Sequence, residues 1–229
     1  MQVLTDEVTV AKNVLLAAAL VVLIVSVGYA AFFLGNLEAA TKSGERINVA
    51  CVGDSITEWS GYPANLQTLL GENYVVGNFG VAGSAVSTNW YKPYMNQSAF
   101  QEGKDFEPAI VVIMLGTNDA HTYQSTSNFA SDYKLLIGEY GALESKPRIF
   151  LVRPPPIFDN ELELSDANLN EGVLPGIEQV GDELNLPTVD VNSALEGHSE
   201  FFGDGVHPSS EGAMVIAEEI SDAIILYGD

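Results

Sequence analysis

Short apolar runs alternate with longer mixed segments from Ile47 onward. The apolar runs are rich in β-branched or aromatic residues and are bounded by Gly, Pro, Asn or Asp, which is typical of strands. They cover residues 47–53, 74–80, 109–116, 148–152 and 187–191. Between them the pattern predicts helices near 61–71, 126–142, 166–185 and 209–226. Because strands that are apolar on both faces and alternate with helices favour a covered parallel sheet, we expect a three-layer α/β/α fold with five parallel strands.

A longer apolar run precedes this domain. No charged residue interrupts residues 14–37, and at 1.5 Å per residue the run spans a hydrocarbon core of about 30 Å. It is longer than the usual apolar region of a signal peptide, and Ala30 and Ala31 give only a weak cleavage signal. We therefore expect residues 1–37 to hold one transmembrane helix at about 14–35, and a cleaved signal peptide is the alternative. The polar residues 38–46 are interpreted as a linker to a domain at 47–229.

Charge narrows the classes of partner. Lys and Arg total 9 against 31 Asp and Glu, a formal net charge of -22. This charge repels phosphate backbones, so we expect no nucleic-acid partner. The single cysteine, Cys51, allows neither an internal disulfide nor a cysteine-rich zinc site. Few lysines and many carboxylates suit a protein that works in high salt, and an acidic soluble domain without that adaptation is the alternative.

Polar clusters follow the predicted strands at the positions where open parallel sheets form their sites. Three of them come directly after strands: GDS at 53–55, NFG at 78–80 and GTND at 116–119. The fourth, DGVHP at 204–208, lies in the loop before the last predicted helix. The sequence therefore predicts a site at the carboxyl edge of the sheet.

Two of these clusters hold a nucleophile and a base. Ser55 follows a strand and a glycine, where a hydroxyl can be exposed, although a helix N-cap is the other interpretation of such a serine. His207 is the candidate base, since Asp204 three residues earlier can hold its Nδ1 and leave Nε2 for the serine. His121 and His198 lack this local pattern of an orienting carboxylate, and His198 is interpreted as a surface loop residue.

A tetrahedral oxyanion needs fixed hydrogen-bond donors. The backbone N–H of Ser55, the backbone N–H of Gly80 and the side-chain amide of Asn118 are the candidates. Gly80 and Gly83 also suit ordinary turns, and Asn118 also suits an Asx turn.

In this order the four clusters resemble the SGNH hydrolase superfamily, the GDSL-like lipases and acylhydrolases. The resemblance covers about residues 47–226 and implies the flavodoxin-like α/β/α fold. It implies Ser55 as nucleophile, His207 as base, Asp204 as its orienting carboxylate, and Ser55, Gly80 and Asn118 as oxyanion donors. No metal or organic cofactor follows from it.

The expected substrate is a short acyl ester, most of all an O-acetylated carbohydrate. The stretches NFGVAGSAV and VVIMLGTND look like those of carbohydrate and sialate O-acetylesterase-like members. We expect a sugar to contact aromatic side chains and the acyl group to meet a stiff proline wall; these candidate residues are Trp59, Trp90, Tyr91, Tyr94 and Pro155. Lysophospholipase or thioesterase activity on fatty acyl groups is the alternative, and a catalytically silent glycan-binding protein is a third.

The predicted partners are a small-molecule or glycan ester and, through the N-terminal helix, a membrane. The predicted location is single-pass and membrane-anchored with the catalytic domain outside the cytoplasm, and secretion after signal cleavage is the alternative.

Overall fold

The computed structural model describes residues 46–122 and 125–227. The described residues fall within the unit Arg46–Asp229, and the other unit, Met1–Glu45, lies outside them. The transmembrane helix predicted at about 14–35 and nearly all of the linker at 38–46 are therefore outside the described residues. No helix within residues 46–122 and 125–227 combines the length and apolar character needed to cross a bilayer.

Five strands form one parallel sheet, as the sequence predicts. They are β1 (Ile47–Gly53), β2 (Tyr74–Gly80), β3 (Ile110–Met114), β4 (Arg148–Val152) and β5 (Thr188–Val189). Their order in the sheet is β2-β1-β3-β4-β5, and each neighbouring pair is parallel. β5 is shorter than predicted because Asp190 leaves the sheet to cap the next helix, where its side chain accepts the N–H of Ser193.

The helices agree with the sequence prediction in place and differ from it in detail. The long ones are α3 (Tyr62–Leu70), α4 (Ser98–Asp105), α5 (Phe129–Gly141), α7 (Leu174–Leu184) and α9 (Ser210–Leu226). The short ones are α2 (Ser55–Trp59), α6 (Asp166–Asn168) and α8 (Val191–Ala194). The helix predicted at 166–185 is three successive segments, since a π-turn at Leu169–Val173 joins α6 to α7. α4 was not predicted.

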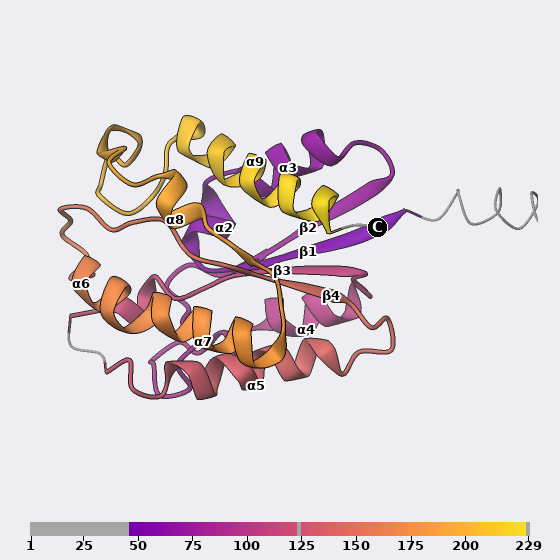
Figure 1. Ribbon diagram of the computed structural model, residues 1–229, viewed down its shortest axis with the longest axis horizontal. Helices are drawn as coiled ribbons and strands as arrows, with labels where there is room; N and C mark the ends of the chain where they lie inside the picture. The colour runs from indigo at the N-terminus through magenta and orange to yellow at the C-terminus, as the bar shows by residue number, and fades with distance from the viewer. Residues whose placement is uncertain (1–45, 123–124, 228–229) are drawn as a thin grey trace, which may run out of the picture. The chain divides into compact units, whose positions relative to one another are not determined.

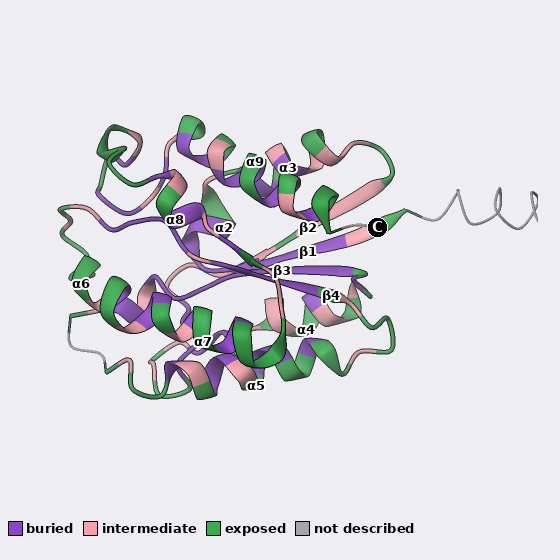
Figure 2. Ribbon diagram, in the orientation of Figure 1, coloured by how far each residue is buried: buried purple, intermediate pink, exposed green. Residues whose placement is uncertain are grey.

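Helices cover both faces of the sheet (Figure 1). Alternate residues of β1 and β3 point to opposite faces, so each strand serves two cores. Val49 and Val112 pack with α3 and α9, while Ala50 and Val111 pack with α5 and α7. Figure 2 shows β3 and most of β1 and β4 buried, β2 at the edge of the sheet partly exposed, and the outer helix faces exposed. The predicted three-layer α/β/α fold is confirmed.

The strand order also places the site. β1 lies between β2 and β3, so the carboxyl ends of these three strands are neighbours. The chain runs outward from β1 in both directions, to β2 on one side and to β3 on the other, which is the switch point where open α/β sheets bind ligands. The segments that follow the three strands therefore meet at one edge.

Candidate active site

Ser55 is the first residue of α2, directly after β1. Asp54 caps this helix, because its Oδ1 accepts the N–H of Ile56 at 2.9 Å. The turn is tight: a Cβ added to Gly53 would lie 1.9 Å from Thr57 Oγ1, so only glycine fits there. The tight turn and the cap together hold the Ser55 side chain at the helix N-terminus, next to the pocket described below.

His207 and Asp204 complete a hydrogen-bonded chain with Ser55. His207 Nε2 lies 2.8 Å from Ser55 Oγ, and His207 Nδ1 lies 2.6 Å from Asp204 Oδ2. The second carboxylate oxygen, Oδ1, accepts the backbone N–H groups of Val206 at 3.0 Å and His207 at 2.8 Å. Asp204 thus fixes both the loop and the imidazole ring, with Nδ1 protonated and Nε2 free to accept the serine proton.

Asp204 stays ionised over the whole neutral range. Partial burial acts to raise the pKa of its carboxyl, but the hydrogen bonds from the His207 backbone and side chain and from Val206 N–H outweigh burial and lower the pKa to about 2. A carboxylate beside Nδ1 stabilises the imidazolium that forms when Nε2 takes a proton. The arrangement therefore suits the predicted roles of Ser55 as nucleophile, His207 as general base and Asp204 as orienting anion.

Two of the three predicted oxyanion donors face the same place. Ser55 and Asn118 both line the pocket that His207 also lines. The Asn118 side chain is held by one amide hydrogen, which it donates to Ser84 O at 2.9 Å, and this leaves its second amide hydrogen for a ligand. No hydrogen bond within the described residues uses the N–H of Ser55.

The structure does not support the prediction that the Gly80 N–H is the third oxyanion donor. Its N–H is already bonded to Asn78 Oδ1 at 2.9 Å, and Gly80 does not line the pocket. Gly80 instead allows the end of β2 to pack on α2, since a Cβ there would lie 2.3 Å from Glu58 N. Gly83, three residues later, lines the pocket with φ at +73°, and no hydrogen bond within the described residues uses its N–H. Gly83, rather than Gly80, is therefore the candidate for the third donor at the pocket.

Ser55, His207, Asn118 and Gly83 line one pocket with a volume of about 320 Å³. Trp59, Trp90 and Tyr91 form aromatic walls, and Leu162 and Leu164 form an aliphatic one. The Trp59 ring lies 5.4 Å from the His207 ring, and the Trp90 ring lies near those of Tyr91 and His121 at 4.8 and 5.3 Å. Trp59 and Tyr91 are 64% and 77% exposed, which leaves their faces available to a ligand.

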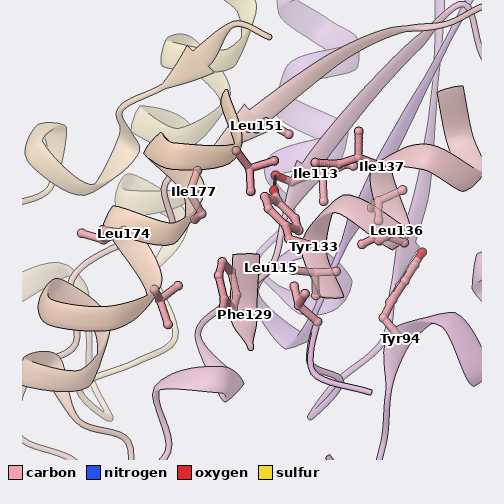
Figure 3. Close-up of a cluster of buried hydrophobic side chains, with 14 of the residues drawn as sticks. Tyr94, Ile113, Leu115, Phe129, Tyr133, Leu136, Ile137, Leu151, Leu174 and Ile177 are labelled. Atoms are coloured by element: carbon pink, nitrogen blue, oxygen red, sulfur yellow. Dashed lines mark hydrogen bonds between the residues drawn. The ribbon is translucent and has the colours of Figure 1, made fainter. Parts of the chain in front are cut away.

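Tyr94 and Pro155 lie away from the pocket, against the prediction. Tyr94 is fully buried in the core, and its hydroxyl donates to Phe79 O at 2.7 Å; Figure 3 shows it with Leu136 in this cluster. Pro155 is buried in the segment after β4, where Asn192 donates to the neighbouring Pro154 O. The proline run therefore does not form the wall of the pocket.

The structure adds residues that the sequence did not single out for the site. His121 lines the pocket, with its Nε2 3.6 Å from Glu163 Oε2. Leu162 and Leu164 reach the pocket because a β-bridge joins His121 to Leu164. No local motif marks these positions, since the bridge pairs segments that are distant in sequence. His198 lies on the surface next to Glu200, as predicted.

No cluster suited to a metal is present in the described part of the chain, where three or more His, Cys, Asp or Glu side chains are nowhere grouped for coordination. The donors around the pocket are a hydroxyl, an imidazole, an amide and backbone N–H groups. Fixed donors of this kind suit the stabilisation of an oxyanion that forms during a reaction in the pocket.

Two buried carboxyl groups lie near this edge. Burial raises the pKa of Asp54 to about 6, against the opposing hydrogen bond from Ile56 N–H. Burial also raises the pKa of Asp119 to about 7, against the N–H groups of Val86 and Ser87. In both cases desolvation of the charge is the dominant cause.

We expect stability to fall as pH rises from about 4 to about 7. In this range the folded state keeps protons on Asp54 and Asp119 that the unfolded state has lost, so raising the pH favours unfolding. For Asp54 alone the effect is on the order of 3 kcal/mol. Urea unfolding across this range at about 1 M NaCl, which screens the surface charges, checks it.

Asp54→Asn and Asp119→Asn are each expected to flatten this pH dependence. The lowered pKa of Asp204 acts only between about 2 and its ordinary value of 3.8, below the range of the test. Stability that is constant or that rises between pH 4 and 7 would contradict the assignment of raised pKa values to these two carboxyls.

A parallel α/β/α sheet with a Ser-His-Asp chain at its carboxyl edge defines the class of α/β proteins with a serine nucleophile. The GDSL-like Lipase/Acylhydrolase family matches residues 51–215, and the chain belongs to this family. The resemblance drawn from the sequence motifs is thereby confirmed.

Proteins similar to this chain in sequence or in fold carry esterase names. An acetylxylan esterase of Xylanibacter ruminicola is 32% identical over 208 residues, which cover 79% of this chain and 43% of the relative. The chain spans about half the length of the curated relatives it matches. A carbohydrate acetylesterase from Sinorhizobium meliloti has the same fold, with 17% identity, a TM-score of 0.62 and coverage of 79% of this chain and 99% of that one.

A catalytic mutant of an acetylxylan esterase from Geobacillus stearothermophilus also has this fold. It is 22% identical, with a TM-score of 0.63 and coverage of 79% of this chain and 94% of that one.

Proposed function

We propose that this protein is a serine esterase that removes short acyl groups, above all acetyl, from a carbohydrate by way of an acyl-enzyme. The observation that carries the proposal is the hydrogen-bonded chain from Asp204 through His207 to Ser55, which ends in a pocket with oxyanion donors. Membership of the lipase/acylhydrolase family supports ester hydrolysis, and the similarity to an acetylxylan esterase supports a carbohydrate ester as substrate.

The reaction follows from the geometry in two halves. Ser55 Oγ attacks the ester carbonyl while His207 Nε2 takes its proton, and the tetrahedral oxyanion accepts hydrogen bonds from the donors near Ser55, Gly83 and Asn118. The same Nε2 then gives its proton to the leaving alcohol. Water repeats the sequence on the acyl-enzyme and releases the acid, with His207 again as base.

The two sides of the pocket receive different parts of the substrate. The leaving alcohol must lie beside His207 Nε2 to be protonated, and the exposed Trp59 ring is next to that imidazole. A sugar ring can stack on such an indole face. In this proposal the acyl group contacts Trp90, Leu162 and Leu164, which also line the pocket.

The pocket size favours a short acyl group. Its volume of about 320 Å³ must hold the acyl group and the part of the alcohol next to the ester. A long chain gains rate only in a groove that buries its CH₂ groups, at roughly 0.8 kcal/mol each. The acidic surface disfavours polyanionic glycans, so a neutral or weakly charged one is proposed.

A panel of esters tests this function. We expect kcat/KM to be highest for p-nitrophenyl acetate and to fall by the octanoate, because a pocket of about 320 Å³ has little room for added methylenes. Acetylated xylo-oligosaccharides should release acetate. In the Trp59→Ala variant, KM for the oligosaccharides should rise while the acyl-length preference stays the same.

A maximum at octanoate or palmitate would replace the deacetylase proposal with lysophospholipase or thioesterase activity. Turnover of no ester, together with binding of acetylated oligosaccharides, would instead point to a catalytically silent glycan-binding protein.

We also propose that the protein is anchored in a membrane through residues 14–35, with the esterase domain outside the cytoplasm. The charge-free run at 14–37 supports the anchor by its length alone. The full-length chain is then expected to stay in the membrane fraction after carbonate extraction. Recovery in the soluble fraction with an intact N-terminus would contradict the anchor, and recovery without residues 1–37 would indicate a cleaved signal peptide.

A further inference from the structure

We propose that Asp119 is a positioning residue that holds two oxyanion donors, Gly83 N–H and the Asn118 amide, in one fixed arrangement. The inference rests on the proposed esterase function and adds a residue to it. Asp119 follows Asn118 in a 3-10 turn, Asn118–Ala120, after β3. Its carboxylate is 2% exposed and faces the loop at 81–93, which carries Gly83.

The turn and the loop are joined at three successive points. Asn118 Nδ2 donates to Ser84 O at 2.9 Å. Val86 N donates to Asp119 Oδ2 at 2.9 Å, and Ser87 N donates to Asp119 Oδ1 at 2.8 Å. All three loop residues lie within four positions of Gly83, so a shift of the loop against the turn breaks these bonds together.

Other contacts brace the loop without linking it to Asn118. Ala82 N donates to Glu58 Oε2 at 2.6 Å, Trp90 Nε1 donates to Gly83 O at 3.0 Å, and Lys92 Nζ donates to Ala82 O at 2.8 Å. These bonds shape the turn around Gly83. Among the hydrogen bonds between described residues, those of Asn118 and Asp119 join the loop directly to the turn that carries the Asn118 amide.

A carboxylate is costly at this position, which points to a role beyond packing. Burial disfavours its charge, and Asp54 adds a second negative group nearby. Its two oxygens can accept two N–H groups at once, whereas asparagine offers one oxygen and would turn an N–H against the other loop N–H. Oxyanion donors act only when they are placed in advance, and a displacement of about 1 Å can cost on the order of 100-fold in rate.

The chain offers a matched control in Asp132 on α5. This carboxylate is also buried, at 8% exposed, and also accepts from the loop, with Oδ2 2.9 Å from Thr88 N and 3.2 Å from Thr88 Oγ1. Asp132 contacts the loop at Thr88, which is farther from Gly83 in sequence than Val86 and Ser87 are. Asp132 is also not next to a candidate oxyanion donor in the sequence, whereas Asp119 directly follows Asn118. Asp119→Asn and Asp132→Asn therefore make the same replacement at two carboxyl groups that accept hydrogen bonds from the same loop.

The experiment compares both variants with the unchanged protein in full-length form. The measurements are kcat and KM for p-nitrophenyl acetate, the inhibition constant of methylboronic acid as a tetrahedral analogue, and Tm. Asp119→Asn is expected to lower kcat by about 100-fold and to weaken boronate inhibition by a similar factor, with KM within about threefold. Asp132→Asn is expected to change kcat and boronate inhibition by less than about threefold, even where it lowers Tm.

Equal losses of kcat in the two variants, or unchanged boronate inhibition in Asp119→Asn, would overturn the proposal. If Asp119→Asn does not fold, Ser87→Pro removes the donor of one of the same hydrogen bonds, and unchanged boronate inhibition there would overturn it. Failure of the esterase proposal is distinguishable, because the unchanged protein would then show no Ser55-dependent turnover at all.

Discussion

Replacing Ser55 with alanine is expected to lower kcat for p-nitrophenyl acetate by at least about 1000-fold, because no other group takes the place of its hydroxyl. Its Oγ is the only atom that His207 Nε2 contacts in the hydrogen bonds of the described residues. His207→Ala is expected to cause a loss of the same order. The double variant should be little worse than either single one, since nucleophile and base act as a unit.

Two comparisons sharpen this result. Asp204→Ala should cost less than His207→Ala, because the imidazole that takes the serine proton is still present, although it loses the carboxylate that orients it and fixes its loop. Ser60→Ala, at the other end of α2, should leave kcat within about threefold. Turnover that persists in Ser55→Ala and disappears in Ser84→Ala would show that the nucleophile is wrongly assigned.

Replacing Asn118 with alanine is expected to lower kcat by about 100-fold to 1000-fold with little change in KM. The Asn118 amide keeps one hydrogen after its bond to Ser84 O, and that hydrogen stabilises charge that exists only in the transition state. Asn118→Asp keeps the shape and places a negative charge there, so its loss should be at least as large. The check is steady-state kinetics on p-nitrophenyl acetate.

A loss below about tenfold in Asn118→Ala would contradict its role as an oxyanion donor. A rise in KM with unchanged kcat would instead assign the amide to binding of the ground state.

The fold was predictable because the apolar pattern of the strands and the spacing of the segments between them both indicate the same architecture. β1 and β3 are apolar on both faces, and the segments between strands have helical spacing, so a covered parallel sheet follows. The placement of Ser55, His207 and Asp204 beside one another was predictable because Ser55 lies just after a strand and Asp204 lies three residues before His207. Both of these features are short-range in the sequence, so the local geometry of a strand end and of one loop is enough to predict them.

The glycine that offers the third candidate oxyanion donor was not predictable from the same reasoning. Gly80 ends β2 and Gly83 lies in the turn that follows, and in the sequence either offers an N–H without a side chain in the way. The Asn78 side chain decides between them, because it accepts the N–H of Gly80 and leaves that of Gly83. Such a bond depends on how the end of β2 packs against α2, which no spacing in the sequence reports.

Trp59, Trp90 and Tyr91 line the pocket as predicted, but the other walls of the pocket did not follow from the sequence, for a related reason. Tyr94 has the same aromatic character as Tyr91, yet one is fully buried and the other is 77% exposed. Leu162 and Leu164 reach the site through the pairing of His121 with Leu164, across more than forty positions. Long-range pairing and burial of this kind arise from the whole fold.

Mapping of the acyl-enzyme tests the central claim most directly. The protein is mixed with p-nitrophenyl acetate, quenched in acid during turnover, digested and analysed by mass spectrometry. The account predicts one acetyl group on the peptide that contains Ser55, and none when His207 is replaced by alanine. Acetyl on a peptide that contains Ser84 or Ser87, or turnover with no acetylated serine at any time, would contradict it.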